Sequence, residues 1–159
     1  MNLKYLLYLL SLVLLNACDY SAGALGGFPN RTFPISKRRL EITIDTLYSL
    51  NPKFKVPGNW ESADSSMIKS YSYLESRTFY FKNDPEEMYY VTFVGDAETF
   101  NDTTKTPIAI RAVNRGGSKW YKYRDLDDKE KAKIESRFDL EIIHRIEIYT
   151  KTKADREIY

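Results

Sequence analysis

The chain holds a single cysteine, Cys18, and a single histidine, His144, and these are the first side chains to consider for chemistry. An imidazole titrates near neutral pH, which makes His144 the candidate general base. No recognisable motif places a serine, a cysteine or a carboxylate beside it, so we interpret it as a structural histidine. Zinc and copper sites need several histidine or cysteine ligands. We therefore predict no metal and no other cofactor.

Acidic and amide side chains crowd the segment from Asp96 to Thr106. Such oxygen-rich segments can bind calcium, but the EF-hand spacing fails because Asn101 stands at the sixth position, where that loop needs glycine. We therefore expect a solvated polar loop that includes Glu98 and Asp102. An enzyme with paired carboxylates needs a cleft and a set separation between them, and the sequence shows neither.

Gly116 and Gly117 form a pair that could cradle a phosphate. Phosphate loops lead into a helix N-terminus, whereas this pair leads into the aromatic segment Lys119 to Arg124. The preceding segment, Pro107 to Asn114, alternates like a strand. A hairpin turn is therefore the better interpretation.

The N-terminal residues form a short apolar segment behind one positive charge. Lys4 is followed by an apolar run from Tyr5 to Leu15, broken only by Ser11. A helix of this length spans roughly 16 Å, whereas a bilayer core needs about 20 residues. The pattern is therefore typical of a secretory signal and not of a membrane span.

The end of this run, Leu15-Asn16-Ala17-Cys18, resembles the lipobox of bacterial lipoproteins. Leucine three positions before the cysteine and a small residue directly before it match that pattern, and Asn16 occupies its most permissive position. The resemblance implies that Cys18 receives a diacylglyceryl group, that a signal peptidase removes residues 1–17, and that the new amino group is acylated. Several acyl chains give stable membrane anchoring. The alternatives are an ordinary signal peptide with an incidental thiol and a buried N-terminal helix.

Removal of residues 1–17 would leave 142 of the 159 residues, enough for one domain with a core. Lys4 is the only charged residue among those removed, so the 24 basic side chains fall to 23, against 22 acidic ones. This balance argues against a nucleic-acid partner, which would need a basic surface. With Cys18 acylated no thiol remains, and packing alone must stabilise the fold.

The remainder divides into a tether and one domain. Residues 18–34 are rich in glycine, alanine, serine and proline and predict a flexible tether. Residues 35–159 predict a single globular domain, because neither an internal repeat nor a second boundary is evident.

The domain is expected to begin with a helix. Ser36 is a plausible N-cap for a helix from Lys37 to Leu50, which the following Asn51-Pro52 ends. A strand is the alternative, because apolar residues in this segment also alternate. Lys53 to Ser66 is expected to be an ordered connection held by Trp60.

A β-rich middle follows, with short turns between segments that alternate or carry many aromatic residues. In Pro107 to Asn114, Ile108, Ile110 and Ala112 are expected on one face. Short turns predict an antiparallel meander and not a parallel sheet. The expected strands are Met67–Leu74, Arg77–Lys82, Glu87–Val94, Pro107–Asn114 and Lys119–Arg124.

The C-terminal part is expected to be one long helix. Asp127 and Glu130 have the spacing of a capping box, and apolar residues recur at helical spacing up to Tyr149. Residues 140–149 also alternate strictly, so a strand there is the alternative. Residues 151–159 are expected to fray.

The aromatic residues of the strands are the remaining candidates for binding. They exceed what one sheet face needs for packing, so some could line an exposed face that meets a protein or glycan partner. The alternative is that they surround the core with their hydroxyls in water. The candidates are Tyr71, Tyr73, Tyr80, Tyr90, Trp120, Tyr121 and Tyr123.

The sequence therefore predicts an exported α+β protein with an antiparallel meander of about four or five strands, an N-terminal helix and a longer C-terminal helix. Cys18 would anchor it to the inner or outer membrane, with the domain on the periplasmic or outer side. The expected role is a non-catalytic binding or accessory module of the cell envelope. The alternatives are an inhibitor or immunity-type protein that binds an envelope toxin or hydrolase, and a carboxylate-dependent envelope enzyme.

Overall fold

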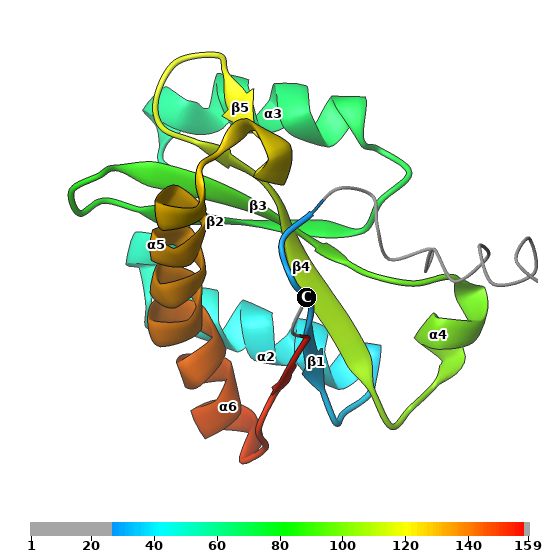
Figure 1. The fold of residues 1–159 in the computed structure, drawn as a ribbon. Coiled ribbons are helices and arrows are strands. Elements are labelled where there is room, and N and C mark those ends of the chain that lie inside the picture. The colour runs from blue at the N-terminus through cyan, green and yellow to red at the C-terminus, as the bar shows by residue number, and fades with distance from the viewer. Residues whose placement is uncertain (1–26, 158–159) are drawn as a thin grey trace, which may run out of the picture.

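The computed structural model of the chain describes residues 27–157. It shows an α+β fold in which one six-stranded antiparallel sheet carries helices on both faces (Figure 1). The predicted fold class is confirmed, including a helix near the start and a longer helical segment at the C-terminal end. The expected signal peptide, Cys18 and most of the expected tether lie outside the described residues.

The sheet has the strand order β2-β3-β4-β1-β6, and β5 pairs with β4. The consecutive strands β2, β3 and β4 form the predicted meander. Gly116 and Gly117 have positive φ angles of 99° and 76° in the turn between β4 and β5, so the predicted hairpin is confirmed. The strands are β1 (Arg31–Phe33), β2 (Ser76–Phe81), β3 (Glu87–Phe93), β4 (Thr106–Asn114), β5 (Trp120–Tyr121) and β6 (Asp155–Arg156).

Helices cover both faces of this sheet. None of those described is long and apolar enough to cross a membrane. A π-helical turn, Asp139–Ile143, joins the last two into one continuous helical segment. The α-helices are α2 (Lys37–Leu50), α3 (Glu61–Ser70), α4 (Ala97–Asn101), α5 (Asp128–Phe138) and α6 (His144–Thr150), with 3-10 turns at Pro52–Phe54, Gly58–Trp60 and Tyr123–Asp125.

Local signals correctly predicted the two principal helical segments. The Ser36 hydroxyl accepts a hydrogen bond from the Arg39 N–H at the start of α2. The Asp127 carboxylate accepts the Glu130 N–H at 2.8 Å, and the Glu130 carboxylate accepts the Asp127 N–H at 3.0 Å. The strand alternatives for residues 37–50 and 140–149 are therefore wrong, because apolar residues at helical spacing face the core in both segments.

The segment around α3 differs from prediction. The expected connection Lys53–Ser66 and strand Met67–Leu74 are replaced by turns and α3, in which Met67 is buried against the sheet. The alternation was only a few residues long, too short to separate a strand from a helix. The expected polar loop after Asp96 likewise contains the short helix α4, capped by the Asp96 carboxylate.

The last expected strand, Lys119–Arg124, is also shorter than predicted. Only Trp120–Tyr121 pairs with β4, and Tyr123–Asp125 forms a 3-10 turn. The Asp125 carboxylate accepts the Lys122 N–H at 2.8 Å, which stabilises this turn in place of a longer strand.

Two segments expected to be flexible pair with each other in the sheet. β1 lies within the predicted tether, and Phe28 and Phe33 are buried. β6 lies within the predicted fraying tail and pairs with β1. Both strands are too short to show an alternating pattern. The prediction of a tether and a fraying tail followed instead from the glycine, proline and charged residues around them.

The sheet separates two apolar layers. Helices α2, α5 and α6 pack on one face, where Ile108 and Ile110 join the principal core. Helix α3 covers the other face above Tyr90 and Ala112. The expectation that Ala112 shares a face with the two isoleucines is wrong, because Tyr90 pairs with Ala112 while Val91 pairs with Ile110. The extra residue of this β-bulge reverses the alternation.

Candidate functional site

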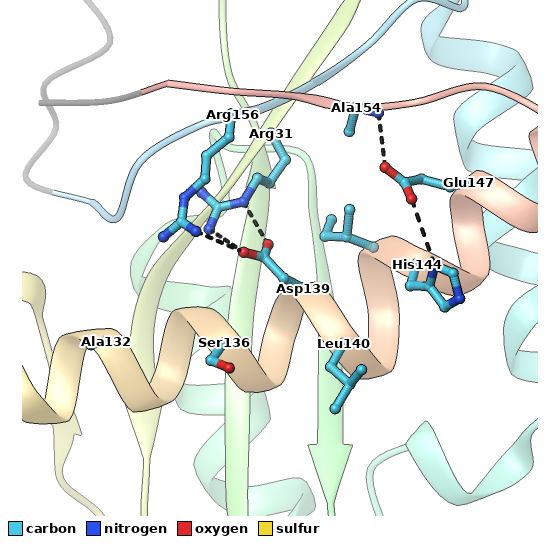
Figure 2. A pocket seen from close by; sticks show the side chains of 10 residues that line it. Arg31, Ala132, Ser136, Asp139, Leu140, His144, Glu147, Ala154 and Arg156 are labelled. Carbon is cyan, nitrogen blue, oxygen red and sulfur yellow. Dashed lines mark hydrogen bonds and ion pairs between the residues drawn. The ribbon is translucent and has the colours of Figure 1, made fainter.

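A groove of about 650 Å³ lies between the C-terminal helical segment and β6 (Figure 2). This volume falls within the range of roughly 300–1,000 Å³ that is typical of binding clefts. Leu140 and Ile143 give the groove an apolar side, and charged side chains from β1, β6 and the helical segment meet at one end. We call this feature the β6 groove.

The charged end of the β6 groove is built around Arg31, whose side chain is buried on β1. Its Nε donates to Asp139 Oδ1 at 2.6 Å, and its Nη2 donates to Asp139 Oδ2 at 3.0 Å. Nη2 also donates to Glu135 Oε2 at 3.3 Å, and Nη1 donates to the Pro29 carbonyl at 2.7 Å. This two-pronged pairing fixes the direction of both side chains.

Arg156 of β6 completes the cluster from the solvent side. Its guanidinium bonds to Glu135 and lies 3.3 Å from Asp139 Oδ2. Two guanidinium groups therefore face two carboxylates, and we call Arg31, Glu135, Asp139 and Arg156 the Arg31 network. The network connects β1 and β6 to the helical segment at Asp139, where the π-helical turn begins.

Glu147 occupies the other end of the groove. Its carboxylate accepts hydrogen bonds from Lys153 Nζ at 2.7 Å and from the Ala154 N–H at 3.1 Å, and His144 Nδ1 lies 3.7 Å away (Figure 2). Burial acts to raise the pKa of Glu147, but these hydrogen bonds and the Lys153 charge outweigh it and hold the pKa below its ordinary value. Glu147 therefore stays ionised and ties the start of β6 to α6.

The charges of the groove differ in exposure according to their sign. The exposed fractions of the side chains are 50% for Arg156, 80% for Lys153 and 55% for His144. Those of the carboxylates are 8% for Glu135, 29% for Asp139 and 13% for Glu147. The exposed cations Arg156 and Lys153 therefore face solvent, and together with the buried Arg31 they balance the three carboxylates.

A second cluster lies between the β2–β3 hairpin and α5. The buried Glu87 carboxylate accepts Arg115 Nε at 3.0 Å, Arg137 Nη1 at 3.1 Å and the Tyr89 hydroxyl at 2.7 Å. Arg115 also donates to Glu130 at 2.6 Å. Arg137 donates to two carbonyl oxygens of the hairpin turn and to Glu141. We call Glu87, Tyr89, Arg115, Glu130 and Arg137 the Glu87 network.

His144 lies in the wall of the β6 groove and not in the core. The sequence identified it as the only histidine, and its interpretation as a structural residue stays a prediction. Ser136 lines the same groove, but within residues 27–157 no hydroxyl forms a hydrogen bond with His144. No group of three or more potential metal ligands occurs in the described part of the chain.

The acidic residues after β3 serve local structure. The Asp96 carboxylate accepts the N–H and hydroxyl of Thr99, and Asp102 accepts those of Thr104. These hydrogen bonds hold the pKa of both carboxyls below the ordinary value. Glu98 lies in the first turn of α4. The geometry assigns these side chains to a helix cap and a turn.

The aromatic residues predicted as a binding face are divided between the two sides of the sheet. Tyr80 and Tyr90 are buried beneath α3, and Tyr71 and Trp120 are half-buried beside Tyr90. Burial, together with a hydrogen bond to Glu86, raises the pKa of Tyr80 to about 12.

The other three predicted aromatic residues lie elsewhere. Tyr121 and Tyr123 are half-buried against the principal core on the opposite side of the sheet, and Tyr73 is exposed. The seven rings thus form no common exposed surface. Cys18, the other predicted site residue, lies outside the described residues.

Few local sequence signals indicated the Arg31 network. Glu135 and Asp139 are four residues apart on a predicted helix and therefore share a face, which is the one local signal. Arg31 and Arg156 lie within the segments predicted to be a tether and a frayed end. Only the pairing of β1 with β6 brings them together.

Comparison with known proteins found no similarity from which to assign a site. No protein-family model matches the chain, and no curated protein or solved structure matches it either.

Proposed function

We propose that this chain is an exported protein, anchored to a membrane by lipid on Cys18, that serves as a non-catalytic binding module of the cell envelope. The observation that carries the binding role is the β6 groove, which combines an apolar side with exposed cations. Both features suit recognition of a partner surface.

The anchoring part of the proposal rests on the lipobox-like residues Leu15 to Cys18 and on their distance from the fold. Nine residue steps separate Cys18 from Gly27, and a chain of that length spans at most roughly 32 Å. An anchored domain would therefore stay close to the membrane surface. The Phe28 N–H already donates to the Ile110 carbonyl in the sheet, at 2.9 Å.

The non-catalytic part is supported by the pairing of the titratable groups in the groove. Glu135 and Asp139 accept hydrogen bonds from guanidinium groups, and Glu147 is held ionised by Lys153 and the Ala154 N–H. A general acid needs a pKa raised towards the working pH, whereas the pKa of Glu147 is lowered. The groove is thus better arranged for binding than for proton transfer.

The anchor is tested by the substitution Cys18→Ala in cells labelled with radioactive palmitate. The native chain should carry label, and the variant should carry none and accumulate as the unprocessed precursor. Cys18→Ser is a second variant with a side chain close in size to cysteine and should behave in the same way. Persistent labelling of either variant would contradict lipidation at Cys18.

The binding role is tested by a photo-crosslinking amino acid at Leu140, which is exposed at the groove, with Ile68 on α3 as the matched control. Crosslinking in intact cells should give a discrete protein adduct at Leu140 and none at Ile68. No adduct at Leu140, or the same adduct at both positions, would contradict a binding role for the groove. An adduct with a toxin or hydrolase would identify the inhibitor alternative, and one with an envelope assembly component the accessory role.

A further inference from the structure

We propose that the β6 groove binds an extended, carboxylate-rich polypeptide segment, which adds to the outer edge of β6 as a further strand. This inference rests on the proposed function and specifies the chemistry and conformation of the partner. It follows from the hydrogen-bond pattern of β6, from the state of the two sheet edges and from the charges along the groove.

The pairing of β1 with β6 fixes the direction of the β6 backbone groups. Arg31 is opposite Arg156, and the Glu157 N–H donates to the Asn30 carbonyl at 3.1 Å. In an antiparallel ladder this bond marks Arg31 and Arg156 as a non-hydrogen-bonded pair. The N–H and C=O of Arg156 must therefore point away from β1, to the outer edge of the sheet.

Ala154 confirms which side this outer edge faces. It is two residues before Arg156, so its backbone groups point in the same direction along an extended chain. Its N–H donates to the Glu147 carboxylate on α6. At Ala154 the outer edge of the chain therefore faces α6 across the groove, and the Arg156 side chain points into the same groove (Figure 2). We infer that a chain lying along this edge would also meet the outward backbone groups of Arg156.

The β2 and β6 edges of the sheet differ in how they are protected. At the β2 edge, the Tyr48 hydroxyl donates to the Thr78 carbonyl at 2.8 Å and so occupies a backbone acceptor. At the β6 edge, no group within residues 27–157 bonds to the Arg156 N–H. Unpaired edge groups are templates for an added strand, and binding by strand addition gains main-chain hydrogen bonds together with contacts to alternate side chains.

The charge of the rim selects the kind of segment. Arg156 in the groove and Lys153, which bonds to Glu147 beside the groove, are the exposed cations, whereas the three carboxylates that they contact are largely covered. Asp155 and Glu157 are also exposed, but strand alternation directs them to the opposite face from Arg156. Carboxylates on the incoming chain would meet this rim favourably, and lysines would be repelled.

The proposal is tested with two acetylated and amidated hexapeptides, one of alternating glutamate and valine and one of alternating lysine and valine. Calorimetric titration of the full chain in detergent micelles should detect binding of the acidic peptide only. Arg156→Ala should weaken this binding about tenfold, because it removes a charged hydrogen-bond donor. Arg38→Ala removes an equal charge from an exposed position on α2 and should leave affinity within about twofold.

The strand-like backbone contact is isolated by comparing Arg156→Ala with Arg156→Pro. Both variants lack the guanidinium, but only proline also lacks the outward N–H. Because this N–H takes no part in the β1 pairing, an edge position of this kind tolerates proline. Arg156→Pro should bind the acidic peptide about fivefold more weakly than Arg156→Ala, with an unchanged circular dichroism spectrum.

Three results would overturn this inference: equal affinity of Arg156→Ala and Arg156→Pro, equal binding of both peptides, or no binding of the acidic peptide. If Arg156→Pro fails to fold, protection of the Arg156 amide from hydrogen exchange by the acidic peptide decides the same question in the native chain. An adduct at Leu140 together with any of these results would preserve the binding module and refute only the acidic strand. Absence of that adduct would refute the binding module itself.

Discussion

The Glu87 network and the Arg31 network use the same chemistry, and both connect the sheet to the C-terminal helical segment. In each, arginine side chains meet carboxylates at the border of the principal core. They differ in what the solvent-side arginine of each network contacts. Arg137 directs its remaining donors to carbonyl oxygens of the β2–β3 turn, whereas Arg156 lies half-exposed at the rim of a groove.

This difference separates a stabilising role from a binding role. A buried carboxylate whose partners are removed leaves an uncompensated charge, which is strongly destabilising. An exposed arginine contributes little to stability, because water solvates its charge when a partner is lost. Arg156 is therefore the member of either network that can change partners at low cost.

The largest loss of stability is expected for Arg137→Ala. It leaves Glu87 buried with Arg115 as its remaining cation and also removes the donors to the Asn83 and Pro85 carbonyls. The free energy of unfolding should fall by about 3 kcal/mol, measured by urea denaturation. A loss below about 1 kcal/mol would show that the buried Glu87 carboxylate does not depend on Arg137 for its compensating charge.

A smaller loss is expected for Arg31→Ala. The guanidinium is buried, but Arg156 already contacts both Glu135 and Asp139 and can partly replace it. We expect a decrease of about 2 kcal/mol in the free energy of unfolding. The double variant Arg31→Ala/Arg156→Ala should lose more than the sum of the two single losses, and strict additivity would show that Arg156 does not compensate.

Arg156→Ala should lower the free energy of unfolding by less than about 1 kcal/mol. Arg31 continues to neutralise Glu135 and Asp139, and the lost side chain is half-exposed. Urea denaturation beside Arg137→Ala gives the direct comparison. Equal losses in the two variants would show that the Arg31 and Glu87 networks do not differ in how much their outer arginine stabilises the fold.

Acidification tests the other end of the groove with the smallest expected effect. The folded pKa of Glu147 is below the ordinary value, so its contribution to stability is present above the unfolded pKa of about 4.3 and is lost as pH falls through the folded pKa. Glu147→Gln should therefore lose less stability than the native chain between about pH 5 and pH 3, by less than about 1 kcal/mol. If the free energy of unfolding falls equally in both proteins, the ionised Glu147 does not stabilise the fold through Lys153 and the Ala154 N–H.

Elements that rest on local signals could be predicted from the sequence. Ser36 and the Asp127–Glu130 pair fixed the starts of two helices, and turn residues fixed the β2–β3 and β4–β5 hairpins. β1 and β6 could not be predicted, because strands of three and two residues have no period and exist only by pairing. The bulge beside Ala112 and the π-helical turn at Asp139 likewise depend on packing between distant segments.

The site was less predictable than the fold for the same reason. His144 was noticed because it is the only histidine, but its surroundings could not be inferred. Arg31 and Asp139 are 108 residues apart in sequence, and no spacing rule links a presumed tether to a helix. The aromatic residues, which composition made conspicuous, are used mainly for packing on both sides of the sheet.

The most direct test of the acidic-strand binding site is hydrogen exchange at two neighbouring amides of β6, with and without the glutamate–valine hexapeptide. The Glu157 amide bonds to the Asn30 carbonyl and serves as the internal control, with similar protection in both states. The Arg156 amide points outward and should exchange rapidly in the free chain, then at least tenfold more slowly in the presence of the peptide. Unchanged exchange at Arg156 with the groove saturated by peptide would contradict the account.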